Sequence, residues 1–269
     1  MSVVRQHLLL GGERAAVQLR ELGVRRGGVL LVHASMRAVG GGTGDMVHAL
    51  LRALGPEGTL VVPAFTPENS DTSRAYLDRV RGLGARDRAA VRAAMPAFDP
   101  AVSPAPTAGV LAETVRLAPG ALRSGHPQTS FAALGPAAGR LLAGHRRDCH
   151  LGEESPLARL YEAGAQVLLL GTGFGSCTAF HLAEYRRPDP PRRRYRCVVG
   201  SEDGPRWWEY EDIALDDGDF SPLGDDFVRT RPGAVAAGRV GAAHSRLFPL
   251  RTAVDFAVGW FEDHRPGGA

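Results

Sequence analysis

Residues 166–184 read QVLLLGTGFGSCTAFHLAE, and this stretch determines how the rest of the chain is interpreted. Its first five residues are apolar and predict a buried strand, and the next five are glycine-rich and predict a tight turn. Thr178 is suited to cap a helix that begins just before His181. On that helix His181 and Glu184 are three residues apart, so the imidazole and the carboxylate share one face. The pattern places a base and a carboxylate at the exit of a strand.

The alternation of strands and helices continues on both sides of this stretch. Upstream, apolar runs predict strands at 29–33 and 59–65, and an amphipathic helix lies between them at 45–54, capped by Thr43 and closed by Gly55-Pro56. Further helices are predicted at 107–117, 136–142, 155–163 and 249–263, and a further strand at 195–199. The sequence therefore predicts an α/β fold, in which a central mixed or mostly parallel sheet is flanked by helices.

Two segments, 70–94 and 188–227, carry little periodic pattern. We expect them to be inserted segments that form the substrate side of a cleft. Because no linker compels a division, we predict a single large domain over residues 1–269.

Composition excludes several classes of protein. The three cysteines lack CxxC spacing, and His145, Cys149, His150 and His181 match no helical pair of ligands, so neither a disulfide framework nor a metal site is expected. No run of eighteen apolar residues and no secretory signal occurs, which predicts a cytoplasmic protein with no membrane partner. The pI is near 9.0, but all 32 basic residues are arginine and the net charge is only +3, so no nucleic-acid partner is expected.

The charge distribution is more informative than the total charge. Residues 202–226 contain ten acidic side chains and one arginine, whereas 186–196 contains six arginines interrupted by prolines that exclude a regular helix. The acidic segment is either a solvated loop or a carboxylate-lined mouth that attracts a polycation. Trp207, Trp208 and Tyr210 within it either stack on sugar rings or anchor the segment. The arginines are either a solvent-facing loop or a contact for cofactor phosphates.

Three familiar catalytic motifs are absent. The GTGFGS turn lacks the third glycine of a dinucleotide fingerprint. A phosphate-binding loop needs a lysine, and the chain has none. No GxSxG nucleophile elbow occurs, which argues against an α/β-hydrolase.

Several blocks in order resemble the aminoglycoside 3-N-acetyltransferase family. The most diagnostic are HPQTSFAALG at 126–135 and HLAE at 181–184, and between them stands the block GEESPL at 152–157. Supporting blocks are LLVHASMRAVGG at 30–41, GPEGTLVVPAFT at 55–66 and MPAFDPAVSPAPTAGVLAETVR at 95–116. The family has His-Ser-Ser where this chain has His33, Ala34 and Ser35, so the first hydroxyl is missing here.

The resemblance implies an acetyl-CoA-dependent N-acetyltransferase with direct transfer to the 3-amino group of a 2-deoxystreptamine aminoglycoside. His181 is then the general base, held by Glu184 or by an acid near Glu211. The residues implied for the coenzyme are His33, Ser35, Met36, His126 and Ser130, with further coenzyme contacts from the backbone of 40–44. Those implied for the polycationic substrate are Glu68, Asp99, Glu209 and Asp212.

Two alternatives stay open from the sequence. One is a family member that acetylates a different amine in biosynthesis, and the other is a non-catalytic protein that sequesters a cation. The oligomeric state is also left open, with a homodimer as one arrangement.

Overall fold

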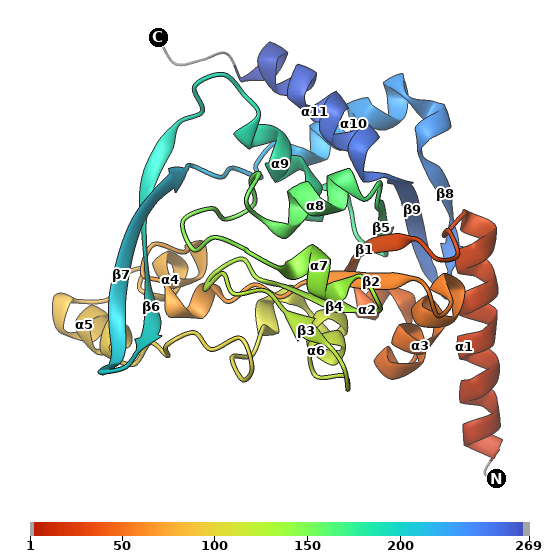
Figure 1. The fold of residues 1–269 in the computed structure, drawn as a ribbon, viewed down its shortest axis with the longest axis horizontal. Coiled ribbons are helices and arrows are strands. Elements are labelled where there is room, and N and C mark those ends of the chain that lie inside the picture. The colour runs from red at the N-terminus through yellow and green to blue at the C-terminus, as the bar shows by residue number, and fades with distance from the viewer. Residues whose placement is uncertain (1–2, 266–269) are drawn as a thin grey trace.

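The computed structural model describes residues 3–265. Its centre is a seven-stranded mixed sheet in the order β3-β4-β2-β1-β5-β9-β8 (Figure 1). The strands are β1 Val29–Ala34, β2 Thr59–Pro63, β3 Leu122–Arg123, β4 Phe131–Leu134, β5 Gln166–Leu170, β8 Ala236–Val240 and β9 Ala243–Pro249. The three central strands β2, β1 and β5 run parallel, and all the flanking pairs are antiparallel. The predicted α/β fold with a mixed sheet is therefore confirmed.

The central strands are mostly apolar, as expected for strands covered by helices on both faces. Along β5, Val167 and Leu169 belong to the core on one face, whereas Leu168 and Leu170 belong to the core on the other. This alternation follows from the period of two in a strand. The predicted strands at 29–33, 59–65 and 166–170 are all present in the sheet.

Eleven helices are found in residues 3–265, and nine of them pack around the main sheet. They are α1 Val3–Leu22, α2 Met36–Val39, α3 Thr43–Leu54, α6 Val110–Arg116, α7 Ala138–Leu142, α8 Pro156–Glu162, α9 Ala179–Tyr185, α10 Phe220–Thr230 and α11 Leu250–His264. Buried residues of α1, α3 and α6 form one core, and those of α7 to α11 form the other. None of the helices in the described part combines the length and apolar character needed to cross a bilayer.

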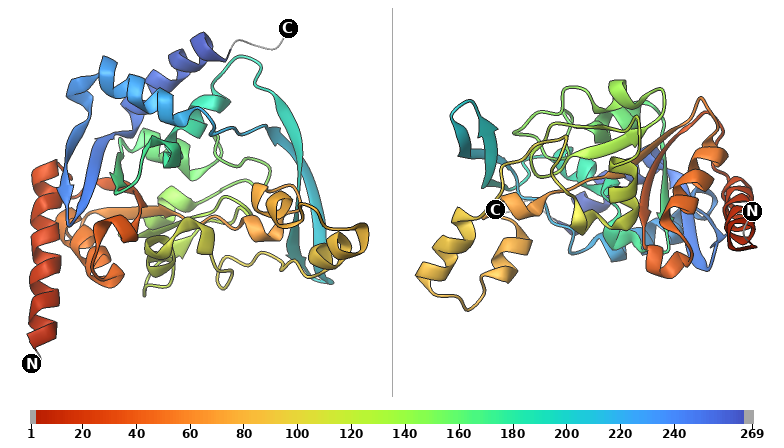
Figure 2. Two further views of the ribbon diagram at one scale, coloured as in Figure 1. Left: turned by 180° about the vertical axis from the view of Figure 1, so that it is seen from behind. Right: turned by 90° about the horizontal axis from the view of Figure 1, so that it is seen from below.

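The predicted strand at 195–199 exists but does not join the main sheet. It lies in β6, Arg192–Ser201, which pairs along its whole length with β7, Gly204–Ile213, as a separate two-stranded ribbon. Helices α4, Arg74–Arg79, and α5, Ala85–Ala93, lie beside this ribbon, at the opposite end of the molecule from α1 (Figures 1 and 2). We call residues 70–94 and the ribbon together the arm.

The arm corrects the interpretation of the two charged segments. Most of the basic cluster forms β6 and part of the acidic segment forms β7, so they face each other across one antiparallel pair. Arg192 donates to Glu211 at 2.7 Å and Arg194 to Glu209 at 3.3 Å. Cross-strand pairs of opposite charge stabilise a two-stranded ribbon that has little core of its own. The basic cluster is therefore half of a hairpin and not a loop.

Two predicted helix caps are wrong. Helix α3 begins at Thr43 itself, with Gly42 at the N-cap, and the side chain of Thr43 accepts no capping bond. Thr178 precedes α9 but has helical backbone angles, and it makes no side-chain cap. Its hydroxyl instead lies 3.3 Å from the Nε2 atom of His33. By contrast, Ser155, the first residue of the helix predicted at 155–163, caps α8 by accepting the backbone N–H of Leu157.

We predict opposite stability effects for two glycine-to-alanine substitutions in helices. Gly224 of α10 faces the buried ring of Phe174, and an added Cβ would lie 1.9 Å from Cγ. Gly224→Ala should therefore destabilise the fold by about 1–3 kcal/mol. Gly259 of α11 has open space, so Gly259→Ala should stabilise by roughly 0.5–1 kcal/mol. Urea unfolding measures the stability of both variants. A stabilised Gly224→Ala variant would contradict the packing of α10 on the ring of Phe174.

Candidate active site

The candidate site lies where the parallel strands β1 and β5 end. His33 of β1 is in register with Leu169 of β5, so both chains leave the sheet at the same edge. Crevices for ligands form at the carboxyl edge of parallel strands because the connections diverge there. After β5 the chain makes the turn Phe174–Ser176 and then enters α9, which carries His181.

His181 and Glu184 form a buried pair on α9. The Nδ1–H group of His181 donates to Oε2 of Glu184 at 2.5 Å, as the three-residue spacing predicts. This leaves Nε2 as the basic nitrogen of the ring, and that atom has no hydrogen-bond partner within residues 3–265. The ring of Phe220 packs against the imidazole at 4.7 Å between centroids.

The carboxylate of Glu184 is fully satisfied. Its Oε1 atom accepts the backbone N–H of Asp216 at 3.1 Å and the guanidinium of Arg265 at 2.5 Å. Arg265 also forms an ion pair with Asp219, which fixes the guanidinium from its other side. A carboxylate this deeply buried is tolerated because every oxygen has a donor. Glu184 therefore holds the imidazole in one orientation.

His181 lies between two clefts. A cleft of about 400 Å³ is lined by β1 and the turn after β5, and includes His33, Thr172, Ser176, Cys177 and Thr178. A second cleft of about 700 Å³ is lined by the arm and by the 126–135 block, and includes Arg74, Asp78, Gln128, His150, Arg193 and Tyr195. His181 lines both clefts, together with Phe65, Thr107, Ala108 and Asp217. The predicted insertions thus form a wall of the larger cleft.

His33 is the second histidine of the smaller cleft. Burial, together with the nearby His181, lowers its pKa to about 3. The ring is therefore neutral at physiological pH and lies in the cleft as a hydrogen-bonding group. Of the other residues predicted to bind coenzyme, Ser35 begins α2 with its side chain making no cap, and Met36 packs at the edge of the core. Neither lines either cleft.

His126 and Ser130 of the 126–135 block lie outside both clefts. His126 is completely buried, and its Nδ1 atom accepts the backbone N–H groups of Gln128 and Thr129. The hydroxyl of Ser130 donates to the carbonyl of Ala64 at 2.8 Å. These contacts shape the turn, which touches the larger cleft through Gln128 and Thr129 instead.

A second buried pair of histidine and carboxylate stands behind the larger cleft. The Nδ1 atom of His150 lies 2.9 Å from Oδ2 of Asp212, which also accepts the hydroxyl of Tyr185 at 2.5 Å. Burial alone would raise the pKa of Asp212, but the hydrogen bonds from His150 and Tyr185 outweigh it and hold that pKa below its usual value. Asp212 is thus buried within the wall and does not line the cleft.

The other acids predicted for substrate or base are dispersed. Glu68 lines a separate small hollow of about 80 Å³, and burial raises the pKa of its carboxyl group. Asp99 accepts the backbone N–H of Ala101 in an exposed turn. Glu209 and Glu211 lie on the ribbon, paired with arginines. The carboxylate that contacts His181 is therefore Glu184 and not Glu211.

Several residues of the site are not marked individually by the sequence. Arg265 comes from a distant segment with no local pattern, whereas Arg74, Arg193, Asp217 and Phe220 lie in the two segments expected to be insertions. The sequence singles out His150 only as a poor match to a metal ligand, although it stands near the GEESPL block. Within residues 3–265 no cluster of three or more histidine, cysteine or acidic side chains is placed to hold a metal ion.

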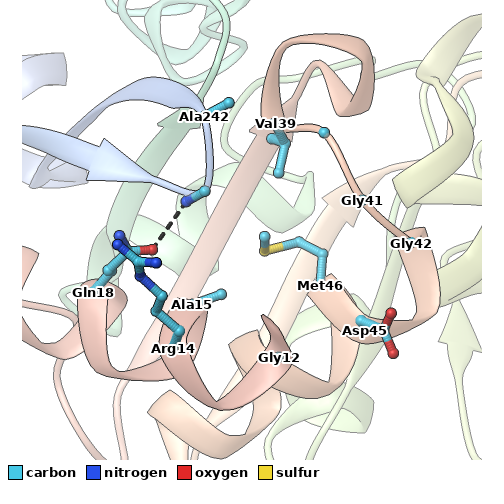
Figure 3. A pocket seen from close by; sticks show the side chains of 12 residues that line it. Gly12, Arg14, Ala15, Gln18, Val39, Gly41, Gly42, Asp45, Met46 and Ala242 are labelled. Atoms are coloured by element: carbon cyan, nitrogen blue, oxygen red, sulfur yellow. Dashed lines mark hydrogen bonds between the residues drawn. The ribbon is translucent and has the colours of Figure 1, made fainter. Parts of the chain in front are cut away.

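The glycine-rich residues after α2 lie at a third hollow, of about 450 Å³, between α1 and the turn that joins β8 and β9 (Figure 3). Arg14, Gln18 and Asp45 contribute its polar side chains, and Gln18 accepts the backbone N–H of Gly241 at 3.0 Å. This hollow shares no lining residue with the two clefts at His181.

The fold and the site define a class of protein: an α/β enzyme in which a buried pair of histidine and carboxylate lies between two clefts. Residues 31–262 match the family model described as aminoglycoside 3-N-acetyltransferase. The chain is 37% identical over 265 residues to aminoglycoside N(3)-acetyltransferase IX of Micromonospora chalcea, covering 91% of this chain and 90% of that protein. The chain therefore belongs to the aminoglycoside 3-N-acetyltransferase family, which is a family of acyltransferases.

Similarity to other characterised relatives extends over nearly the whole fold. The chain is 36% identical over 247 residues to the SPbeta prophage-derived aminoglycoside N(3')-acetyltransferase-like protein YokD of Bacillus subtilis strain 168, covering 90% of this chain and 89% of that protein. The crystal structure of YokD has a TM-score of 0.86 over 96% of this chain and 95% of that chain, at 32% identity. AAC-IIIb, solved as a binary complex with CoASH, has a TM-score of 0.79 over 94% and 97%, at 31% identity.

The buried histidines predict a loss of stability in acid. Burial lowers the pKa of His33 to about 3 and that of His145 to about 4, below the ordinary value of 6.5. As the pH falls, the unfolded chain takes up these protons at a higher pH than the folded chain does. The stability that the two neutral histidines contribute is therefore fully present above pH 6.5, and the free energy of unfolding falls as the pH decreases toward the folded pKa values. Between about pH 7 and about pH 5 the loss should be roughly 2 kcal/mol for each histidine.

Urea unfolding at the two pH values measures this loss. In a His145→Gln variant the difference in unfolding free energy between the two pH values should be smaller by the contribution of one histidine. This holds whatever the variant's stability at neutral pH. An unchanged difference would show that His145 is not buried in its neutral form.

Proposed function

We propose that the protein transfers the acetyl group of acetyl-CoA to an amine by direct attack, with His181 as the general base. The observation that carries this proposal is that His181 is shared by two clefts. A direct transfer needs the donor and the acceptor on opposite sides of one base, within reach of it at the same time.

The smaller cleft suits the thioester end of the donor. Its apolar walls come from Val32, Pro63 and Phe65, and its polar groups are mostly neutral hydroxyls. A pantetheine arm is long, uncharged and partly polar, so such a lining matches it. The binary complex of AAC-IIIb with CoASH supports coenzyme A as the donor in this fold.

The acceptor binds in the larger cleft in this proposal. Its unprotonated amine nitrogen attacks the thioester carbonyl and forms a carbon–nitrogen bond, and Nε2 of His181 takes the proton from that nitrogen. The carbon–sulfur bond then breaks, and the sulfur leaves as thiolate or, after taking a proton, as thiol. Glu184 stabilises the imidazolium that forms, because the negative charge on Oε2 lies beside Nδ1. The hydroxyl of Thr178 lies in the donor cleft as a candidate donor to the oxyanion.

Kinship supports an aminoglycoside as the acceptor, with the 3-amino group of a 2-deoxystreptamine ring as the nucleophile. The main alternative within the same reaction is a different amine from a biosynthetic route. A protein that only sequesters a cation would bind the acceptor without releasing thiol from acetyl-CoA.

We predict that His181→Ala lowers kcat roughly a hundredfold or more, because the base is removed. The measurement is the release of free thiol from acetyl-CoA in the presence of an aminoglycoside. His244→Ala is the matched control, since His244 is exposed and lines neither cleft. Normal turnover by the His181→Ala enzyme would exclude the assignment.

Glu184→Gln should lower kcat by on the order of tenfold to a thousandfold while KM changes little, because the substitution keeps the shape but removes the charge that stabilises the imidazolium. Steady-state kinetics across pH measure this effect, and a thermal unfolding curve checks that the variant is folded. A change confined to KM would contradict the proposed role of Glu184.

A further inference from the structure

The larger cleft has an unexpected balance of charge. Four fully charged side chains line it: Arg74, Asp78, Arg193 and Asp217. Both carboxylates already have cationic partners, since Asp217 pairs with Arg74 at 3.4 Å and Asp78 pairs with Arg81 at 2.6 Å. Within residues 3–265, Arg193 has no carboxylate within 4.0 Å. The lining charges therefore balance, but within residues 3–265 Arg193 is the one charged lining side chain without an ion-pair partner.

Arg193 is held in place rather than free to swing away. One of its guanidinium nitrogens donates to the carbonyl of Thr72 at 2.9 Å, and the group lies over the ring of Tyr195 at 4.6 Å from the centroid. Tyr195 in turn packs on His150 at 4.3 Å. A guanidinium has five N–H donors, and only one of them is used here. The remaining donors are available to a ligand.

The acids of the ribbon do not line this cleft. Glu209 and Glu211 pair with Arg194 and Arg192 on the ribbon, and Asp212 is buried with His150. An acceptor that carries only ammonium groups would therefore meet a fixed guanidinium without a matching carboxylate, and like charges in a cleft disfavour binding. A phosphate or carboxylate on the acceptor would instead accept two parallel N–H bonds from Arg193.

We propose that the acceptor amine of this enzyme belongs to a molecule that also carries an anionic group, such as a phosphorylated amino sugar or aminoglycoside, and that Arg193 binds that group. Arg193 acts in this proposal as a specificity-determining residue of the larger cleft, while His181 performs the proton transfer. The inference rests on the proposed function, because it assumes that the larger cleft receives the acceptor.

The test compares matched pairs of acceptors that differ only by a phosphate: glucosamine with glucosamine 6-phosphate, and kanamycin A with its 3′-phosphate. Thiol release from acetyl-CoA gives kcat/KM for each. In the unmodified enzyme the phosphorylated member of at least one pair should be preferred by about tenfold or more, as expected for one good charge-assisted contact.

Arg193→Ala should abolish this preference, and Arg193→Lys should keep part of it. Arg194→Ala is the matched control, because Arg194 is the neighbouring arginine on β6 but lies outside the cleft and pairs with Glu209. It should leave the preference unchanged. A thermal unfolding curve for each variant confirms that it is folded.

The outcomes separate the two proposals. If thiol is released but the unphosphorylated acceptors are used as well or better, or if Arg193→Ala retains the preference, the inference about the acceptor is wrong and the proposed acetyl transfer stands. If no acceptor in the panel releases thiol, the inference is also overturned, and the proposed function loses its support with it.

Discussion

The site depends on one buried carboxylate. Glu184 contacts the imidazole of His181, the backbone at Asp216 and the guanidinium of Arg265, so it joins α9, the loop after β7 and the end of α11. A buried carboxylate is costly unless each oxygen is paired, and here each one is. The requirement to satisfy this charge fixes where three distant parts of the chain meet. The orientation of the His181 imidazole follows from that meeting.

The sequence could predict the half of this arrangement that is local. The spacing of His181 and Glu184 on a helix, and the placement of that helix after a buried strand, follow from short-range rules that the structure confirms. Arg265 could not be predicted, because it lies 81 residues from its partner and nothing near it in the chain signals the contact. The same limit applies to Arg193 and Asp217, which reach the cleft only through the fold of the arm and the loop that follows it.

The charged segments show why composition alone misled. A count of residues indicates an acidic segment at 202–226 and a separate basic cluster at 186–196. In the structure β6 and β7 place parts of both segments opposite each other, so Arg192 pairs with Glu211 and Arg194 with Glu209 within the ribbon. A one-dimensional count cannot reveal this pairing, because it depends on the register of two strands.

The two clefts at His181 are built on different parts of the fold. His181, Glu184 and the smaller cleft are built on the parallel strands and α9, where packing on both faces holds each group in place. The larger cleft takes one wall from the arm, which has only a small core around Tyr195 and Cys197. Substitutions in the arm can therefore reshape the larger cleft while the geometry of His181 and Glu184 stays intact. The fold consequently constrains this pair far more tightly than it constrains the larger cleft.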